Sequence, residues 1–212
     1  MQCGIDAGDF GTWLRQTRDA LRGTGGAVVP CGDCTGCCTS SYSIEVRPTD
    51  TAALERLPAK SLSRSQGSAA GNWTVRPNAD GTCPLLSCGR CTLYAHRPQT
   101  CLDYDCRVFA AAGIEAGGAG KAVINRRVRE WRFEFASDDD RRAHAAIRAA
   151  AAFIREAQDQ FAPGVAPRNP LGIAALALRV YPVFLPPGPP HAEADTARAV
   201  VAVAAAFDHG HA

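Results

Sequence analysis

Long apolar runs and a secretory start are missing from this chain of 212 residues. The longest apolar run, AVVAVAAAF at 199–207, is far shorter than the roughly 18 residues that span a bilayer. The start, MQCGIDAGDFGTW, has no basic segment followed by an apolar stretch, which a secretory signal requires. We therefore expect a cytoplasmic protein without a membrane anchor.

Excess charge and lysine are also scarce. The formal net charge of +2 is too small to indicate nucleic acid or an anionic membrane as a partner. Lys60 and Lys121 are the only lysines, and arginine supplies the other basic groups, a bias that base composition explains. The basic stretch NRRVREWR at 125–132 holds one aromatic ring, but we expect a half-buried strand with Trp131 inward rather than a nucleic-acid site.

Common catalytic motifs are absent as well. The sequence contains no P-loop, no G-x-G-x-x-G after a strand, no H-E-x-x-H and no G-x-S-x-G. The stretch GGAGK at 117–121 lacks the spacing of a phosphate loop and the Ser or Thr after lysine, so we interpret it as a loop. These absences leave open whether the protein is an enzyme.

Hydrophobic periodicity predicts both helices and short strands. Hydrophobic residues make up 46% of the chain and charged residues 21%, which is usual for a globular protein with a core. The predicted helices cover 9–22, 48–57, 138–161, a segment opened by Asn169-Pro170, and 191–207. The predicted strands cover 42–46, the start of 72–83, and 128–135, whereas 58–72 is predicted to be a loop.

This order of elements predicts an α+β fold. We expect a small irregular cysteine-rich metal-binding module with short strands, flanked by an N-terminal helix and a C-terminal helical region. The predicted parts are an N-terminal helix over 1–26, the module over 27–136 and the helical region over 137–212.

Cysteine is what the chain has in excess. Nine of the ten cysteines lie within 31–106, and CGDCTGCC at 31–38 places four of them in eight positions. Thiols stay reduced in the cytoplasm, so such clustering indicates metal binding more than disulfides. The ten are Cys3, Cys31, Cys34, Cys37, Cys38, Cys83, Cys88, Cys91, Cys101 and Cys106.

The first group has the spacing C-x2-C-x2-C followed by a further cysteine. Two residues between thiols let a tight turn aim both sulfurs at one centre, as zinc and iron–sulfur sites do. Gly32 and Gly36 can adopt left-handed dihedrals in such a turn. Cys37 and Cys38 are adjacent, and neighbouring side chains point apart in extended chain. The pair therefore favours two metals, or two irons of one cluster, over one zinc ion.

The two groups together resemble a known family. CGDCTGCC is followed by C-P-x-L and then C-x-x-Y-x-x-R-P-x-x-C within CPLLSCGRCTLYAHRPQTCLDYDC at 83–106. This order resembles the CxxCxxCC family of zinc- or iron-chelating proteins, the YkgJ type, and flagellin lysine methylase carries a related cluster. The resemblance covers roughly residues 28–107.

The resemblance implies eight metal ligands. They are Cys31, Cys34, Cys37, Cys38, Cys83, Cys91, Cys101 and Cys106. Pro84, Leu85, Tyr94, Arg97 and Pro98 match further recurrent positions of the family. Cys3 and Cys88 are extra, and Cys88 forms another C-x2-C with Cys91, so it is an alternative ligand.

Residues around the cysteines have two interpretations each. Arg97 either offsets thiolate charge or forms a surface ion pair, and the tyrosines Tyr94 and Tyr104 either donate to sulfur or pack. His96 is an alternative ligand or a surface residue. Asp103 and Asp105 flank Tyr104, and an extended segment would place both carboxylates on one side, near the metal or in a hydrogen-bonded loop.

Three functions follow from these patterns. The first is a protein whose cysteines hold an iron–sulfur cluster, in a redox or maturation role, and the adjacent thiols favour it. The second is a zinc protein whose closed sites are structural and whose helices bind a protein partner. The third is a metal-dependent enzyme that modifies proteins, which the methylase relative suggests.

Overall fold

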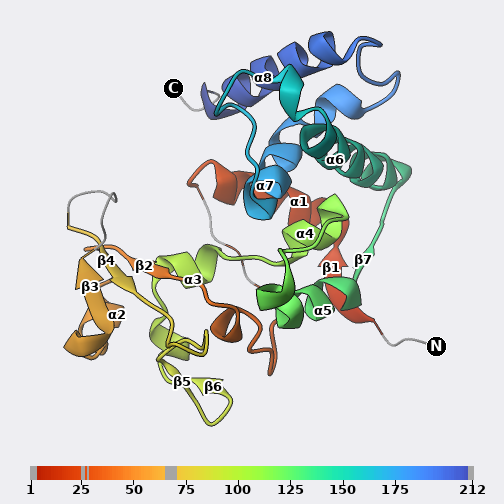
Figure 1. Cartoon of the computed structure of the whole chain (residues 1–212). Coiled ribbons are helices and arrows are strands. Elements are labelled where there is room, and N and C mark those ends of the chain that lie inside the picture. Colours follow the sequence, from red (N-terminus) through yellow and green to blue (C-terminus); the bar gives the residue numbers. More distant parts are fainter. Residues whose placement is uncertain (1–3, 25–26, 28, 65–70, 210–212) are drawn as a thin grey trace. The chain divides into compact units, whose positions relative to one another are not determined.

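The computed structural model describes residues 4–24, 27, 29–64 and 71–209, and it divides into two compact units. Unit 1 comprises Met1–Gly26, Cys106–Gly117 and Val128–Ala212, and unit 2 comprises Ala27–Asp105 and Gly118–Arg127. Each unit is assembled from segments that are not consecutive in the chain. The division into three consecutive parts that the sequence suggests therefore stays a prediction. The mixture of helices and short strands confirms the predicted α+β class (Figure 1).

Unit 1 combines long helices with one pair of parallel strands. Strands β1 (Ile5–Asp9) and β7 (Trp131–Glu134) pair with Ile5 opposite Trp131. The helices are α1 (Phe10–Leu21), α4 (Arg107–Ala112), α6 (Asp138–Glu156), α7 (Pro170–Val180) and α8 (Glu193–His209), with 3-10 turns η5 (Gln158–Gln160) and η6 (Tyr181–Phe184). Helix α5 (Ala122–Glu130) crosses the boundary between the units.

Polar side chains begin three of these helices, as the sequence predicts for two of them. The carboxylate of Asp9 accepts a hydrogen bond from the Thr12 amide at 2.8 Å at the start of α1. Asn169 accepts from the Gly172 amide at 2.8 Å and precedes Pro170 at the start of α7. Ser137 forms a reciprocal capping box at the start of α6, which satisfies amides that the helix leaves unpaired.

The core of unit 1 combines aromatic rings with aliphatic side chains. The Phe10 ring is fully buried and lies 5.3 Å from the rings of both Phe133 and Phe135. The predicted apolar stripe of α6 is buried at Ile147 and Ile154. Such a core buries enough apolar area to stabilise this unit by packing.

Three segments of unit 1 differ from the prediction. The predicted strand over 128–135 is a strand only from Trp131, because residues before it finish α5. The predicted helix over 138–161 ends at Glu156, and Phe161 is buried beyond its end. Strand β1 was not predicted, because IDAGD has no clear alternation and its register is interrupted between Asp6 and Gly8.

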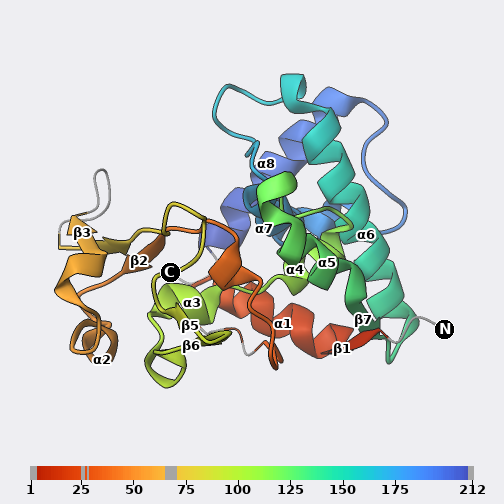
Figure 2. The same cartoon turned by 60° about the horizontal axis from the view of Figure 1, so that its bottom comes forward.

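Unit 2 consists of short elements. Strands β2 (Ile44–Val46), β4 (Trp73–Val75) and β3 (Leu62–Arg64) form an antiparallel sheet in that order, and β5 (Leu86–Ser87) pairs with β6 (Arg90–Cys91) as a hairpin. The helical pieces are α2 (Thr51–Leu54), α3 (Gln99–Asp103), and the 3-10 turns η1 (Cys37–Thr39), η2 (Ala59–Ser61), η3 (Tyr94–His96) and η4 (Ala119–Lys121). Figure 2 shows α3 and the hairpin to the right of strands β2 and β3.

The predicted loop over 58–72 contains η2 and β3, and residues 65–70 of it lie outside the described residues. Asp50 precedes α2 as expected but does not cap it with its side chain. Its carboxylate accepts from the Arg47 amide at 2.8 Å and from the Gln99 amide at 2.9 Å. Asp50 thereby joins the sheet region to the start of α3.

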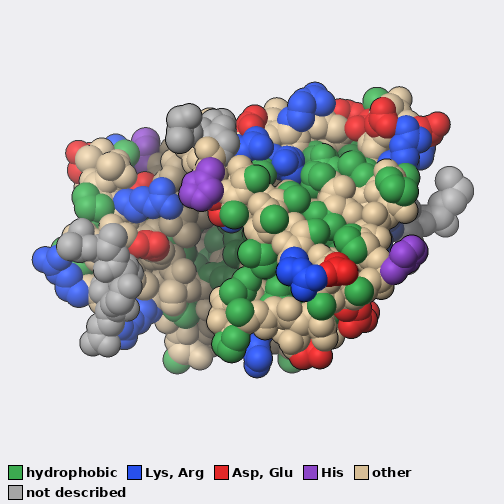
Figure 3. All heavy atoms as spheres, turned by 90° about the horizontal axis from the view of Figure 1, so that it is seen from above, with side chains coloured by type: hydrophobic (Ala, Val, Ile, Leu, Met, Phe, Trp, Pro, Cys, Tyr) green, Lys and Arg blue, Asp and Glu red, His purple; other side chains and the backbone are tan. Residues whose placement is uncertain are grey.

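The exposed side of α8 is apolar over much of its length. Val201 is 43% exposed, and Ala202, Ala205 and Ala206 are also exposed. Figure 3 views this side of unit 1 and shows apolar side chains spread across it. In the part of the chain that the structure describes, no helix is both long and apolar enough to cross a membrane.

Candidate metal centre

The first cysteine group forms a tight turn in unit 2. The Cys31 amide donates to the Val29 carbonyl at 2.7 Å, and the Cys34 amide donates to the Cys31 carbonyl at 2.9 Å. Gly32 has a positive φ of 53°, as predicted, which favours glycine. The Gly36 amide donates to the Cys34 sulfur at 3.4 Å, so the backbone wraps around that thiol.

Gly36 itself has φ −51°, so the left-handed conformation predicted for it is wrong. Its small size matters for a different reason. A Cβ at this position would lie 3.2 Å from Ile124 Cγ1 and 3.4 Å from the Cys34 sulfur. Glycine therefore allows the turn to approach α5 closely while the thiol keeps its place.

The adjacent cysteines differ in exposure. Both belong to η1, but Cys37 is exposed whereas Cys38 is half-buried. The negative charge of the Cys37 thiolate acts on Lys121 and opposes the burial that lowers the pKa of that ammonium group. Cys38 packs against the apolar core of unit 2. The two sulfurs thus have different surroundings.

The second cysteine group meets the first through the backbone. The Cys83 amide donates to the Cys38 carbonyl at 2.6 Å, and the Cys83 side chain is 6% exposed. Cys91 ends the hairpin, opposite Leu86, and also packs against the core that holds Cys83. Cys88 lies in the hairpin turn with φ 48° and is exposed. Cys88 is therefore part of the exposed hairpin turn and not of the core that holds Cys83.

Cys101 is brought to the same region by α3. Its amide donates to the Pro98 carbonyl at 2.9 Å, and Pro98 is fully buried at the start of the helix. The fixed φ of proline supports a sharp entry into this short helix. Pro98 thus marks the start of the helix that carries Cys101.

Burial and mutual repulsion govern these thiols. Burial, together with the neighbouring sulfurs of Cys83, Cys91 and Cys34, raises the pKa of Cys38 to about 11. Burial raises the pKa of Cys101 to about 12, again with help from Cys83, Cys91 and Cys38. Such thiols stay protonated near neutral pH and lose their protons readily only if a cation compensates the charge.

Arg97 is a cation that acts on both groups. It lowers the pKa of Cys31, Cys38 and Cys101 against the effect of burial. Its guanidinium carbon lies 3.9 Å from the centre of the Tyr94 ring. Its Nε is buried and has no hydrogen-bond partner among the described residues. This position fits the predicted role of offsetting negative charge on a thiolate centre.

The thiols are gathered but not yet arranged as a coordination shell. Among the described residues, no group of three or more His, Cys, Asp or Glu side chains is positioned so that it could hold a metal ion. The donors fit a thiophilic ion by chemistry, since Cys83 belongs to one small core, Cys38 and Cys91 pack against it, and Arg97 supplies positive charge. Binding would therefore require the sulfurs to move together, which couples metal binding to folding.

Cys106 belongs to unit 1. Its sulfur accepts a hydrogen bond from the Trp131 indole at 3.2 Å, and both side chains are buried. The alternation of 128–135 correctly predicted an inward Trp131, but it carried no sign of a sulfur partner. The assignment of Cys106 as a ligand stays a prediction, and Cys3 lies outside the described residues.

The other candidate residues near the cysteines differ from one another in exposure and in their contacts. Tyr94 is 51% exposed, and the Tyr104 hydroxyl lies 3.0 Å from that of Tyr42. His96 is exposed. Asp103 is exposed within α3 whereas Asp105 is 5% exposed, so the two carboxylates have different surroundings. The expectation of an extended segment with both carboxylates on one side is wrong, because Asp103 is helical.

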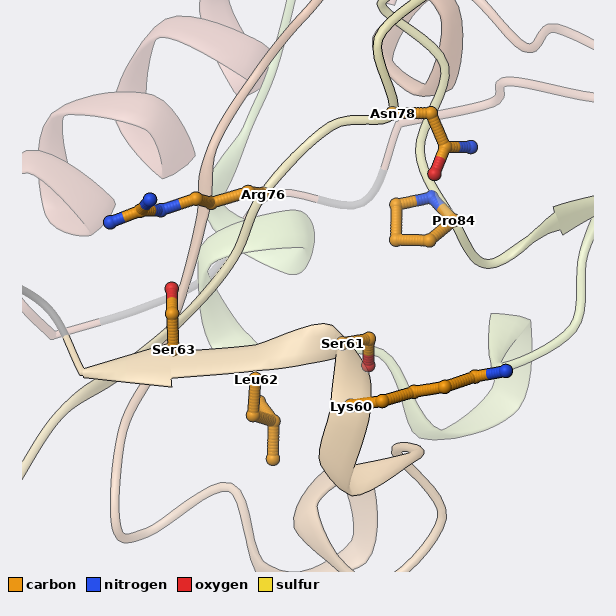
Figure 4. Close-up of a pocket in the computed structure, with 7 residues that line it drawn as sticks. All are labelled: Lys60, Ser61, Leu62, Ser63, Arg76, Asn78 and Pro84. Carbon is orange, nitrogen blue, oxygen red and sulfur yellow. The ribbon is translucent and has the colours of Figure 1, made fainter.

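A cavity of about 310 Å³ lies in unit 2, and Pro84, which follows Cys83, lines it. Its lining is Lys60, Ser61, Leu62, Ser63, Arg76, Asn78 and Pro84. Figure 4 shows the Lys60 and Arg76 side chains extending in opposite directions from it. The Ser61 hydroxyl donates to the Pro58 carbonyl at 2.7 Å. The polar groups thus do not converge on one point as a small-anion site requires.

A family model described as "CxxCxxCC: Putative zinc- or iron-chelating domain" matches residues 30–117. The match confirms the resemblance drawn from the motifs and supports metal binding in general. It covers the cysteines from Cys31 to Cys106 and less than half of the chain. No curated protein and no solved structure matches this chain.

Proposed function

We propose that this is a cytoplasmic metal-binding protein whose clustered cysteines chelate iron or zinc as thiolates. One observation carries the proposal. Cys83 belongs to one small core and Cys38 packs against it, and the Cys101 thiol from a third segment interacts electrostatically with both. Buried sulfurs this close repel one another when ionised, and a bound cation converts that repulsion into attraction.

The metal also has a structural reason in unit 2. The apolar core there consists of seven buried side chains, two of them alanine or cysteine, and the strands have two or three residues each. Small cores of this kind contribute little stabilisation by themselves. Ligands taken from the first turn, the hairpin and α3 would join segments that backbone hydrogen bonds join only weakly.

Iron held in a cluster is the form that the sequence favours, because eight cysteines and an adjacent pair suit several metal atoms. A redox or maturation role would follow from such a cluster. Zinc in closed sites is the second form, and it would make the cysteines a scaffold for binding a protein partner. In both forms the cysteines bind the metal as thiolates, so identifying the bound metal distinguishes the two forms.

The test is anaerobic purification of the full chain, followed by an absorption spectrum and metal analysis of one sample. Iron, sulfide and broad absorbance near about 400 nm would support the cluster form. A colourless protein with zinc would support the closed form. A Cys88→Ser variant is the matched control, since its thiol lies in the hairpin turn, and it should keep all the metal. A well-folded protein that binds neither metal would disprove the proposal.

A further inference from the structure

We propose that the cysteines of unit 2 form two separate thiolate metal sites. The inner set is Cys38, Cys83, Cys91 and Cys101, and the outer set is Cys31, Cys34 and Cys37. This division rests on the proposed function, because it assigns particular thiols to particular ions within the same metal-binding module.

Packing and hydrogen bonds define the inner set. Cys83 lies within the core cluster, and Cys38 and Cys91 pack against that same cluster. The backbone bond of 2.6 Å from the Cys83 amide to the Cys38 carbonyl joins the ends of two distant segments. Cys101 lies on α3, which packs against β2, and Val46 of β2 belongs to the same core cluster.

The outer set is defined by the turn at 31–37. The Cys34 amide donates to the Cys31 carbonyl at 2.9 Å, and the Gly36 amide donates to the Cys34 sulfur at 3.4 Å. Cys37 follows at the same spacing and is exposed near Lys121. These three thiols come from one short loop and need no other segment of unit 2 to bring them together.

The adjacent pair marks the boundary between the sets. Cys38 packs against the core cluster that contains Cys83, and its carbonyl accepts the Cys83 amide at 2.6 Å. Cys37 is exposed whereas Cys38 contacts the core, so the two adjacent sulfurs have different surroundings. Two sites agree with this difference and keep the backbone hydrogen bond between Cys83 and Cys38.

The two sets predict different chemistry. Four thiolates complete a tetrahedral shell around Zn²⁺ or Fe²⁺ and leave no position for another ligand, which is typical of structural sites. Three thiolates leave one position for a further donor or an external ligand, and the outer loop is more exposed. The inner ion would then hold unit 2 together while the outer ion is the more accessible one.

The experiment uses the full apo chain titrated anaerobically with Co²⁺, which reports tetrahedral thiolate coordination by its absorption. The expected endpoint is two ions per chain. Cys101→Ser and Cys34→Ser should each lose one ion and keep the other, and Cys88→Ser should bind both. Loss of both ions in Cys34→Ser, or an endpoint of a single ion, would overturn the division while leaving metal binding intact.

A second measurement avoids variants that fail to fold. Wild-type chain with one equivalent of Zn²⁺ is treated with a thiol-alkylating reagent, and the modified cysteines are located by mass spectrometry. Protection should appear first at the inner set, while the outer set is modified at least tenfold faster. Equal protection of all seven thiols would contradict two sites. Absence of any bound metal would instead refute the proposed function.

Discussion

Unit 1 and unit 2 bury side chains in different ways. Unit 1 places long helices around a parallel strand pair and buries large side chains such as Phe10, Phe109 and Ile147 completely. Unit 2 has strands of two or three residues and a core in which Cys83 is itself a member. Apolar burial therefore supports unit 1, whereas the stability of unit 2 should depend on what its cysteines bind.

Removal of metal should produce the largest difference in stability between the two units. Thiolate-bound zinc contributes on the order of 10 kcal/mol to the folding of small modules. A chelator should therefore abolish amide-exchange protection in β2 and β4 of unit 2 and leave that of α6 in unit 1 unchanged. Hydrogen exchange with mass spectrometry measures both. Equal loss of protection in the two units would remove the contrast between them.

A substitution that creates a cavity in the aromatic core of unit 1 should have the next largest effect on stability. Phe10 is fully buried among the rings of Trp13, Phe133 and Phe135. Phe10→Ala should lower the free energy of unfolding by about 3 to 5 kcal/mol. Thermal or denaturant unfolding measures the loss, and metal content per folded chain should stay unchanged. Val201→Ala, at an exposed position of α8, is the control.

Neutralising Arg97 should act on unit 2 through its metal. The guanidinium offsets charge at Cys38 and Cys101. Arg97→Gln should weaken metal affinity roughly 10- to 100-fold, the range found when groups supporting metal ligands are removed. Competition with a coloured chelator measures this affinity. Arg90→Gln removes the same charge from an exposed hairpin position, and an equal loss there would show that net charge alone is responsible.

Loss of a helix cap should affect unit 1 more modestly. The Ser137 hydroxyl accepts from the Asp140 amide at 3.1 Å at the start of α6. Ser137→Ala should destabilise the unit by about 1 kcal/mol, whereas Ser137→Thr should retain most of the stability. Denaturant unfolding compares the two variants. If metal affinity changed as much as stability, the cap would not be specific to unit 1.

Acidification should have the smallest effect, again in unit 1. Burial lowers the pKa of His144 below its ordinary value of 6.5, with help from Arg148, and the ring lies 5.2 Å from Phe10. The unfolded chain then takes up the proton first. The contribution of neutral His144 is therefore complete above about pH 6.5 and is lost as the pH falls through the folded pKa. His144→Phe should flatten the pH dependence of unfolding below about pH 6.5, and an unchanged slope would exclude this origin.

Local chemistry predicted much of unit 1. Asp9 and the Asn169-Pro170 pair begin α1 and α7 where expected, because a cap depends on a few neighbouring residues. The period of apolar residues in α6 correctly identified its buried face. The strand pair was harder to predict, since β1 is paired with a strand more than a hundred residues away and its own pattern is irregular.

For the candidate site too, local sequence patterns were predictive and contacts between distant residues were not. Spacing and order of the cysteines predicted a metal-binding module, and the family match over residues 30–117 agrees with it. Spacing did not reveal that Asp103 lies in a helix, that Asp50 joins the start of α3, or that Trp131 donates to the Cys106 sulfur. The contacts of Asp50 and Trp131 join residues 49 and 25 positions apart, which spacing within one segment does not show.

The amino-acid sequence by itself determined the donor chemistry of this protein: ten thiols, the C-x2-C-x2-C turn, and the helices whose caps and apolar faces are local. The tertiary structure alone decided which thiols become neighbours. Cys38 and Cys83 meet through a backbone hydrogen bond, and α3 adds Cys101. The physical reason is that ligand type is a property of the side chain, whereas proximity arises from packing around a shared core.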